Sequence, residues 1–397
     1  MNMRTMRNGL RLAMASVASF SPSSVLAKEA ACALHADPVG TTSVHKDLLT
    51  LPGQFHDEFK GGLAVRSPTL ENHDASYRWF DLNDLEKPFV PPKGLTVVMS
   101  LRSSHFVTRR LAGQCCREEL GILRGGEGKP TWLGPRWFPR SAVETRSGEI
   151  WAIVLGEPGR NLEPPVVNLL HIGPDGKVDY RPLKVSDWAR DANLATAADD
   201  RPALLLLRRG EGHLRLLLSW SLDPSATVLL DEVEASVAAA KLSQWTGVEI
   251  STAADGEHGL GVAWRPLTDH KSDASWDRSA TAEIRWMTAE PSGPPSRPQR
   301  HSTMAQPLGF RSGHGPWGLA RSGLRASQLG GRAFFAWTEG SEILGARSTD
   351  TAASFIAPSE IREAGAPLID LQSRPSGLDM ILLHNLPKVR GFRIRCD

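Results

Sequence analysis

Seven short apolar runs recur along the chain, each bounded by Gly, Pro, Asp or Ser. Runs of this kind are typical of short β-strands separated by turns. Their starts lie on average roughly 53 residues apart, which suits four-stranded sheets joined by loops of variable length. The runs are GGLAVRS (61–67), LTVVMSL (95–101), EIWAIVL (149–155), ALLLLRR (203–209), GLGVAWR (259–265), RAFFAWT (332–338) and LDMILLH (378–384). The pattern predicts a nearly all-β chain built from repeated small sheets.

The length of the chain limits how these sheets can be arranged. A chain of 397 residues exceeds the roughly 250–300 residues that one hydrophobic core supports. A lone four-stranded sheet leaves both faces uncovered, whereas sheets stacked radially bury their faces against each other. We therefore expect a β-propeller of about seven blades, within a range of six to eight, with its ring closed by strands from the N- and C-terminal ends.

The first residues have the pattern of a secretory signal peptide. Three arginines precede a mildly apolar stretch, and small residues follow up to Ala27. We expect residues 1–27 to be removed, the protein to be secreted or periplasmic, and residues 28–397 to form a single propeller domain. A disordered N-terminus is the alternative. No later run of about 18 apolar residues predicts a transmembrane segment.

The charge balance bears on possible partners. The chain has a formal net charge of +2, and removing three arginines with residues 1–27 leaves −1. Nucleic-acid binding needs a clustered positive surface. A nearly neutral mature chain therefore argues against a nucleic-acid partner.

Four cysteines fit an oxidising compartment. Cys32 lies just after the expected mature start and Cys396 is the penultimate residue, so a disulfide between them would join the two chain ends. The adjacent Cys115 and Cys116 form a vicinal disulfide or stay reduced. Four independent thiols, or lipid modification of Cys32, are the alternatives.

The stretch STDTAASF resembles the Asp-box of sialidase-like, BNR-repeat propellers, a Ser/Thr-x-Asp-x-Gly-x-Thr-aromatic pattern. Ser348, Asp350 and Phe355 stand at matching positions, and Ala352 replaces the Gly. A second match follows another strand pair. It consists of Ser221 and Asp223, with Ser225 in place of the Gly. The resemblance implies a propeller in which these residues staple turns, because an Asp side chain accepts hydrogen bonds from N–H groups of its own turn.

The same resemblance gives little support to sialidase chemistry. Arg66 in VRSPTL is similar to the family's early arginine motif for a sugar carboxylate. The family's nucleophile is a tyrosine in the C-terminal half, but the only tyrosines are Tyr77 and Tyr180. The catalytic residues of any other glycoside hydrolase mechanism stay unassigned. The sequence predicts no cofactor, and the polar loop DHKSD (269–273) is a weak metal motif, so no metal is expected.

One segment, at about 291–330, is rich in Pro, Gly and Ser and carries arginine but no acidic residue. Loops of this length are functional or disordered. The planar guanidinium of arginine binds carboxylate or sulfate with paired hydrogen bonds, and the ring of Trp offers a flat face to a sugar ring. The candidate ligand residues are Arg297, Arg300, Arg311, His314 and Trp317. We therefore expect a monomeric exported module that binds a glycan, another anionic ligand or a surface protein. A sialidase-like glycoside hydrolase is the alternative function.

Overall fold

A computed structural model of the chain describes a large part of the segment after Ala33. The chain separates into two units, Met1–Ala33 and Leu34–Asp397, and every described residue belongs to the second. The described residues are 34–43, 49–50, 62–67, 76–81, 84–89, 92–111, 118–124, 128–135, 137–156, 166–183, 192–210, 212–234, 249–265, 279–280, 283–302, 306–307, 324–339, 342–356, 368–374, 377–384 and 388–396. The expected signal peptide therefore lies outside them.

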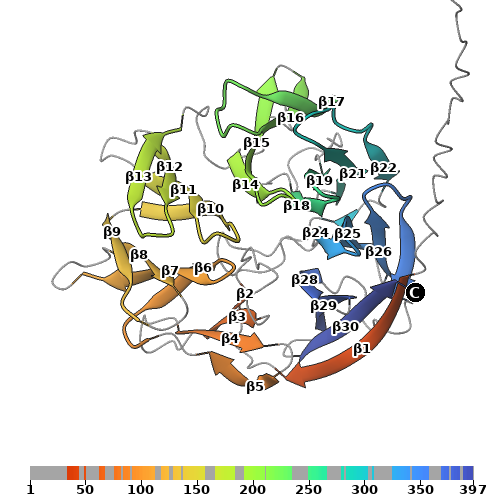
Figure 1. The fold of residues 1–397 in the computed structure, drawn as a ribbon. Helices are drawn as coiled ribbons and strands as arrows, with labels where there is room; N and C mark the ends of the chain where they lie inside the picture. Colours follow the sequence, from red (N-terminus) through yellow and green to blue (C-terminus); the bar gives the residue numbers. More distant parts are fainter. Residues whose placement is uncertain are drawn as a thin grey trace, which may run out of the picture. The chain divides into compact units, whose positions relative to one another are not determined.

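The described residues form seven four-stranded sheets and one two-stranded pair (Figure 1). The first four sheets are β2–β5 (Leu49–Thr50, Gly62–Ser67, Ser76–Asp81, Asp84–Phe89), β6–β9 (Thr96–Ser100, Ser104–Arg110, Glu118–Arg124, Thr131–Pro135), β10–β13 (Trp137–Glu144, Ile150–Gly156, Val167–Ile172, Val178–Pro182) and β14–β17 (Ala192–Thr196, Pro202–Gly210, His213–Ser219, Val228–Glu234). The others are β18, β19, β21 and β22 (Glu249–Asp255, Gly259–Arg265, Glu283–Ala289, Gln299–Ser302), β24–β27 (Arg325–Leu329, Arg332–Glu339, Glu342–Arg347, Ala353–Ile356), and β28–β30 with β1 (Leu368–Arg374, Gly377–His384, Lys388–Cys396, Leu34–Ser43). The short strands β20 (Ser279–Ala280) and β23 (Gln306–Pro307) pair with each other.

Each four-stranded sheet is antiparallel and follows the order of the chain, apart from the last one. There, β1 from the N-terminal side pairs with β30, and Leu34 stands opposite Cys396. This is the strand that the sequence analysis assigned to ring closure. The closed ring and the blade number of seven stay predictions.

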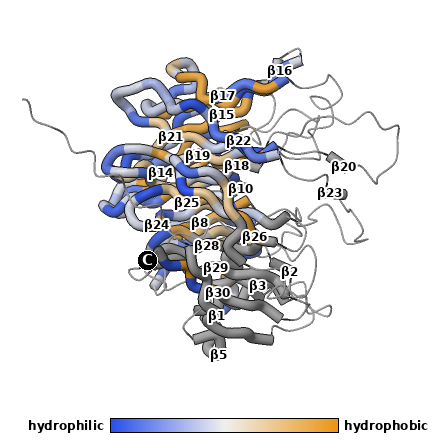
Figure 2. The backbone as a smooth tube through the Cα atoms, turned by 90° about the vertical axis from the view of Figure 1, so that its right-hand side faces the viewer, coloured by the Kyte–Doolittle hydropathy of each residue, from blue (hydrophilic) through white to orange (hydrophobic). Residues whose placement is uncertain are grey.

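Hydrophobic clusters fill the spaces between the faces of neighbouring sheets. One of them joins β14–β17 to the next sheet through Leu205, Leu216, Val262 and Trp264, all fully buried. Equivalent clusters join β6–β9 to β10–β13, β10–β13 to β14–β17, and the β18–β22 sheet to β24–β27. Figure 2 shows the hydrophobic residues concentrated within the strands. The core is therefore divided among the sheet interfaces, as expected for stacked blades.

Strand β19 shows how closely the sheets approach. All seven of its residues are buried, because neighbouring sheets cover both of its faces. A Cβ atom on Gly261 would lie 2.2 Å from the Cβ of Ala333 and 3.1 Å from Cζ of Phe335, both in β25. Only a residue without a side chain allows this approach.

The fold is all-β and belongs to the β-propeller class, as predicted. In the part of the chain that the structure describes there is no helix, and hence none long and apolar enough to cross a membrane. The segment at 291–330, interpreted from sequence as a loop, contains β22, β23 and β24.

Candidate functional site

The turns that join the first and second strands of five consecutive sheets form the candidate site. We call them the inner turns; they comprise residues 101–103, 145–149, 197–201, 256–258 and 330–331. Backbone hydrogen bonds link the last three of them: the N–H of Ala198 donates at 3.0 Å to the carbonyl of Gly259, which directly follows the fourth turn, and that of Gly256 donates to the carbonyl of Gly331 at 2.9 Å. These three turns are thus held together across the sheet interfaces.

A buried carboxylate anchors the first of these turns. Glu144, at the end of β10, is 3% exposed and accepts four hydrogen bonds from the neighbouring sheet. The N–H and hydroxyl of Ser103 donate at 2.7 and 2.6 Å, and those of Ser104 at 3.1 and 2.8 Å. Because a buried carboxylate needs such donors, these bonds offset its desolvation and fix the backbone beside Arg102.

His105 directly follows Ser104, one of the two serines that bind Glu144, and is fully buried. Burial lowers the pKa of His105 from 6.5 to about 4, although the carboxylate of Glu144 acts in the opposite direction. The side chain is therefore neutral at physiological pH and contributes no charge to the site.

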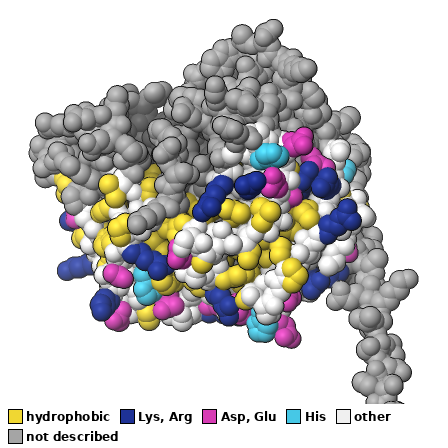
Figure 3. All heavy atoms as spheres, turned by 90° about the horizontal axis from the view of Figure 1, so that it is seen from above, with side chains coloured by type: hydrophobic (Ala, Val, Ile, Leu, Met, Phe, Trp, Pro, Cys, Tyr) yellow, Lys and Arg dark blue, Asp and Glu magenta, His cyan; other side chains and the backbone are white. Residues whose placement is uncertain are grey.

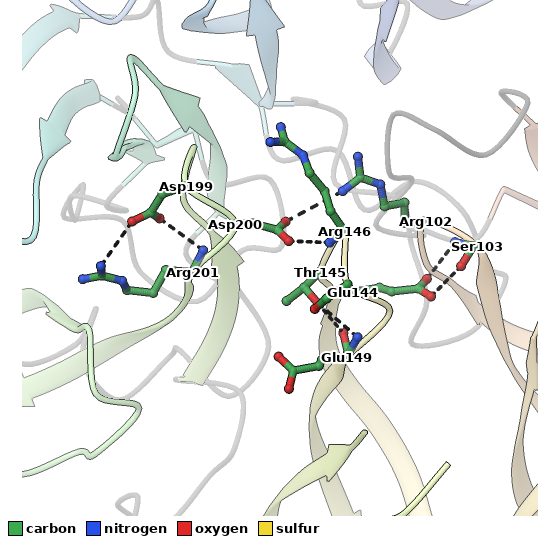
Figure 4. Close-up of polar contacts among 10 residues, drawn as sticks. Arg102, Ser103, Glu144, Thr145, Arg146, Glu149, Asp199, Asp200 and Arg201 are labelled. Atoms are coloured by element: carbon green, nitrogen blue, oxygen red, sulfur yellow. Dashed lines mark hydrogen bonds and ion pairs between the residues drawn. The ribbon is translucent and has the colours of Figure 1, made fainter. Parts of the chain in front are cut away.

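Two arginines and one aspartate meet where three inner turns approach each other (Figure 4). The backbone N–H of Arg146 donates to Oδ2 of Asp200, and Nη1 of Arg102 lies 3.7 Å from Oδ1 of the same carboxylate. Figure 4 shows the Arg102 side chain pointing toward this carboxylate and the Arg146 side chain extending away from it. Arg146 is exposed, and its guanidinium has no hydrogen-bond or ion-pair partner among the described residues. The guanidinium of Arg146 is thus exposed on the turn whose N–H binds the same carboxylate that Arg102 faces.

The neighbouring carboxylate, Asp199, is bound by residues of its own turn and of the next inner turn. It accepts the backbone N–H of Arg201 at 3.2 Å and lies 3.2 Å from Nη2 of that guanidinium. Nδ1 of His258, on the next inner turn, lies 3.8 Å away. Asp199 therefore stabilises its own turn, whereas Asp200 faces the two arginines.

An aromatic stack lies beside the second inner turn. The rings of Trp151 and His171 are stacked with centroids 4.0 Å apart, and Nε2 of His171 lies 3.6 Å from a carboxylate oxygen of Glu149. The guanidinium of Arg181 lies 5.8 Å from the Trp151 ring centre. The stack fills the space between two sheets and is half-buried, so it supports the turn that carries Arg146.

The ligand residues proposed from sequence are not gathered at the inner turns. Arg66 lies in β3, of which the backbone is described. Arg297 and Arg300 are exposed, in the turn before β22 and in β22 itself, the outer strand of its sheet, where Arg300 stands opposite Arg285. The remaining candidates lie outside the described residues: Arg311, His314 and Trp317.

The Asp-box candidates occupy turns between third and fourth strands. Oδ1 of Asp223 accepts the N–H of Ser225 at 2.9 Å and its hydroxyl at 2.8 Å, and the backbone bond lowers the pKa of Asp223. The Ser221 hydroxyl lies 3.2 Å from that of Ser219. This turn has the local hydrogen bonds of an Asx turn.

The other Asp-box candidate, the stretch that contains Ser348 and Asp350, lies between β26 and β27. The Ser348 hydroxyl donates at 2.7 Å to Oδ1 of Asp255 in the neighbouring sheet, so it links two sheets. The N–H of Asp350 donates to the Arg347 carbonyl at 3.0 Å, which closes the turn. Phe355 lies in β27, of which the backbone is described at this position.

Of the four cysteines in the predicted disulfides, the structure describes one. Cys396 ends β30, whereas Cys32, Cys115 and Cys116 are outside the described residues. Both disulfides stay predictions. Within the described ranges, no group of three His, Cys, Asp or Glu side chains is placed to hold a metal ion.

One side of the molecule carries charged and hydrophobic side chains close together. Figure 3 shows Lys and Arg side chains next to Asp and Glu side chains, with hydrophobic side chains exposed among them. The large hydrophobic residues most exposed in the described ranges are Val166, Tyr180, Val228 and Leu229. Charges of both signs thus lie close together on this side.

Sequence analysis did not identify Arg102, Arg146 or Asp200. Each lies in a short polar stretch after a first strand, in LRSSH, TRSGE and DDRP. A repeated polar turn at the same place in successive sheets is the signal that could have indicated them. Their proximity depends on sheet stacking, because Arg146 and Asp200 are 54 residues apart in sequence.

Comparisons with known proteins give similarity of fold and no family. No protein-family model matches the chain, and no curated protein matches it. A solved structure of a catalytically inactive virginiamycin B lyase from Staphylococcus aureus with quinupristin is 13% identical, with a TM-score of 0.46, over 91% of this chain and 99% of that one. The polysaccharide lyase Uly1 is 8% identical, with a TM-score of 0.47, over 90% and 99%. The β-propeller domain of the Trilobed protease from Pyrococcus furiosus is 10% identical, with a TM-score of 0.33, over 76% and 94%. The activities in these names belong to those proteins.

Proposed function

We propose that this protein is an exported propeller that binds an anionic ligand, such as an acidic glycan, at its inner turns. The observation that carries the proposal is the exposed guanidinium of Arg146, which has no partner among the described residues and extends from a turn whose N–H binds the same carboxylate, Asp200, that Nη1 of Arg102 faces. A planar guanidinium donates paired hydrogen bonds to carboxylate or sulfate, and two of them within reach of one anion add charge.

The rigidity of the inner turns supports binding. The N–H groups of the two serines after Arg102 bind the buried Glu144. The N–H of Arg146 binds Asp200 across the interface with the next sheet. Binding costs less when the contacting groups are already held in place. Arg102 and Arg146 start from such fixed backbones, so little ordering beyond their own side chains is needed.

Three carboxylates at this place are engaged within the protein. Glu144 accepts four hydrogen bonds, Asp199 pairs with an arginine of its own turn, and Asp200 binds an N–H and an ion-pair partner. Two others, the half-exposed Glu149 and the exposed Glu257, have only histidines as ion-pair partners among the described residues. Because a glycoside hydrolase requires two carboxylates free to act on a glycosidic bond, hydrolysis is the competing function that the experiment below tests.

The proposal includes the expectations that concern the rest of the chain. Residues 1–27 act as a signal peptide, the chain is a secreted or periplasmic monomer, and Cys32 pairs with Cys396. The relation to Asp-box propellers is supported by the turn at Asp223, whose carboxylate accepts the Ser225 N–H. Arg297 and Arg300 lie at an outer strand, so we place the ligand at the inner turns instead.

A glycan array tests this function. The purified protein is applied to neutral, carboxylated and sulfated glycans, and each retained glycan is examined by mass spectrometry. We expect intact acidic glycans to be retained, and retention to fall for Arg146→Gln but not for Arg297→Gln. Cleaved glycans would establish the hydrolase instead. Retention of neutral glycans alone would contradict the anionic site.

A further inference from the structure

We propose that the ligand of the inner turns presents a carboxylate, and that Asp200 occupies the position of this carboxylate in the free protein. This inference rests on the proposed function and names the class of ligand that the same site accepts. It also assigns Asp200 a role, that of an internal competitor for the ligand.

The contacts of Asp200 are those that a bound carboxylate would make. One oxygen accepts the backbone N–H of Arg146, and the other faces Nη1 of Arg102 at 3.7 Å. The latter separation exceeds the usual N–H···O length of 2.7–3.2 Å, so Arg102 makes an ion pair here and not a close hydrogen bond. A carboxylate that is free to adjust its position could improve this contact.

Arg146 supplies a contact that Asp200 does not use. Its backbone N–H binds Asp200, but its guanidinium has no partner within the described ranges. A ligand carboxylate that accepts the same N–H would also accept the forked donors of this guanidinium once the exposed Arg146 side chain turns toward it. This additional contact favours exchange of the internal carboxylate for the external one.

The backbone at Asp200 is also unusual. Its φ is +69°, and among the described residues the only other non-glycine residue with a positive φ is Leu222. Asp is one of the few residues with a side chain that adopt this left-handed backbone as single residues in turns. The N–H of Asp200 donates to the carbonyl of Ala197 at 3.0 Å, so the turn fixes the backbone from which this carboxylate faces Arg102 and the N–H of Arg146.

Asp199 provides a matched comparison on the same turn. It has a similar exposure, 18% against 20% for Asp200, and it is also an aspartate in an ion pair. Its partners, however, are Arg201 and His258, and it does not contact Arg102 or Arg146. A general effect of removing one negative charge would appear at both positions, whereas competition for the ligand concerns Asp200 alone.

The experiment measures affinity by titration calorimetry with two probes of equal length, an oligogalacturonate and a sulfated neutral oligosaccharide. We expect Asp200→Asn to bind oligogalacturonate at least about tenfold more tightly than the unchanged protein. Asp199→Asn should bind it as the unchanged protein does, and Arg146→Gln should lose binding. Asp200→Gly is the second variant, because Gly adopts a positive φ without strain and keeps the turn intact.

The outcomes separate this inference from the function on which it rests. If the unchanged protein binds oligogalacturonate through Arg146 and neither Asp200 variant binds more tightly, Asp200 is a positioning residue and the inference is wrong. If the sulfated probe binds as tightly as oligogalacturonate, the carboxylate class is wrong although the anionic site stands. If neither the unchanged protein nor either Asp200 variant binds any acidic probe, the proposed function itself fails.

Discussion

Replacing His105 with Gln or Asn should remove a specific part of the pH dependence of stability. Burial holds the pKa of this side chain at about 4 in the folded protein, against 6.5 in an unfolded chain. The unfolded state therefore binds a proton as the pH falls below 6.5, while the folded state does not. Stability is present above pH 6.5 and is lost as the pH falls toward 4.

The magnitude follows from the two pKa values of His105. The full shift of 6.5 to about 4 corresponds to about 3 kcal/mol, since one pKa unit is worth about 1.4 kcal/mol. Between pH 7.5 and pH 4.5 the side chain should reduce the free energy of unfolding by about 2.5 kcal/mol. Other groups that titrate in this range contribute equally to the unchanged protein and to the variants, so the difference between their pH profiles isolates His105.

Urea unfolding at pH 7.5 and pH 4.5 measures this difference. The variants should be less stable than the unchanged protein at pH 7.5, because they disturb a buried position. They should then lose about 2.5 kcal/mol less on acidification. Parallel pH profiles for the variants and the unchanged protein would refute the assignment of a buried neutral His105.

Three further predictions concern contacts between sheets. Gly261→Ala should destabilise the fold by about 1–3 kcal/mol, because the new Cβ would overlap Ala333, and thermal unfolding would detect this. Asp231→Asn should cost about 1.5–3 kcal/mol, because it removes one of the two carboxylates that pair with the buried guanidinium of Arg285 and leaves Glu283 as the other; an unchanged urea midpoint would contradict it. Glu144→Gln should cost about 1.5–3 kcal/mol by weakening charge-assisted bonds, and a stability equal to that of the unchanged protein would count against the anchor.

The apolar runs in the sequence predicted the positions of the sheets because the most deeply buried strands are the most apolar ones. Each of the seven runs falls in a different four-stranded sheet, and six of them contain the second strand, such as β19. A second strand is covered on both faces by neighbouring sheets, so nearly every position is apolar. This is the strongest signal that a stacked sheet leaves in a sequence.

Outer strands leave much weaker signals. Four of the five residues of β13 and three of the four residues of β22 are exposed. The strand β22 has the sequence QRHS, which shows no apolar alternation, and it was therefore interpreted as part of a basic loop. Hydrogen bonding to β21, and not its own composition, makes this segment a strand.

The candidate site could not be derived from sequence for a related reason. Arg102, Arg146 and Asp200 come from three different sheets and meet only because stacking brings the inner turns together. Short polar turns containing Arg, Ser or Asp are common on protein surfaces. Only the sheet order shows which of these turns are neighbours.

The measurement that tests the central claim most directly is the affinity of the protein for an acidic oligosaccharide before and after Arg146→Gln, with Arg297→Gln as the control. The side chain of Arg146 makes no hydrogen bond or ion pair with the described residues, so replacing it should leave the stability of the protein unchanged. The account predicts at least about a tenfold loss of affinity for Arg146→Gln alone, the scale of a charge-assisted hydrogen bond. Equal affinities of the unchanged protein and Arg146→Gln would contradict it.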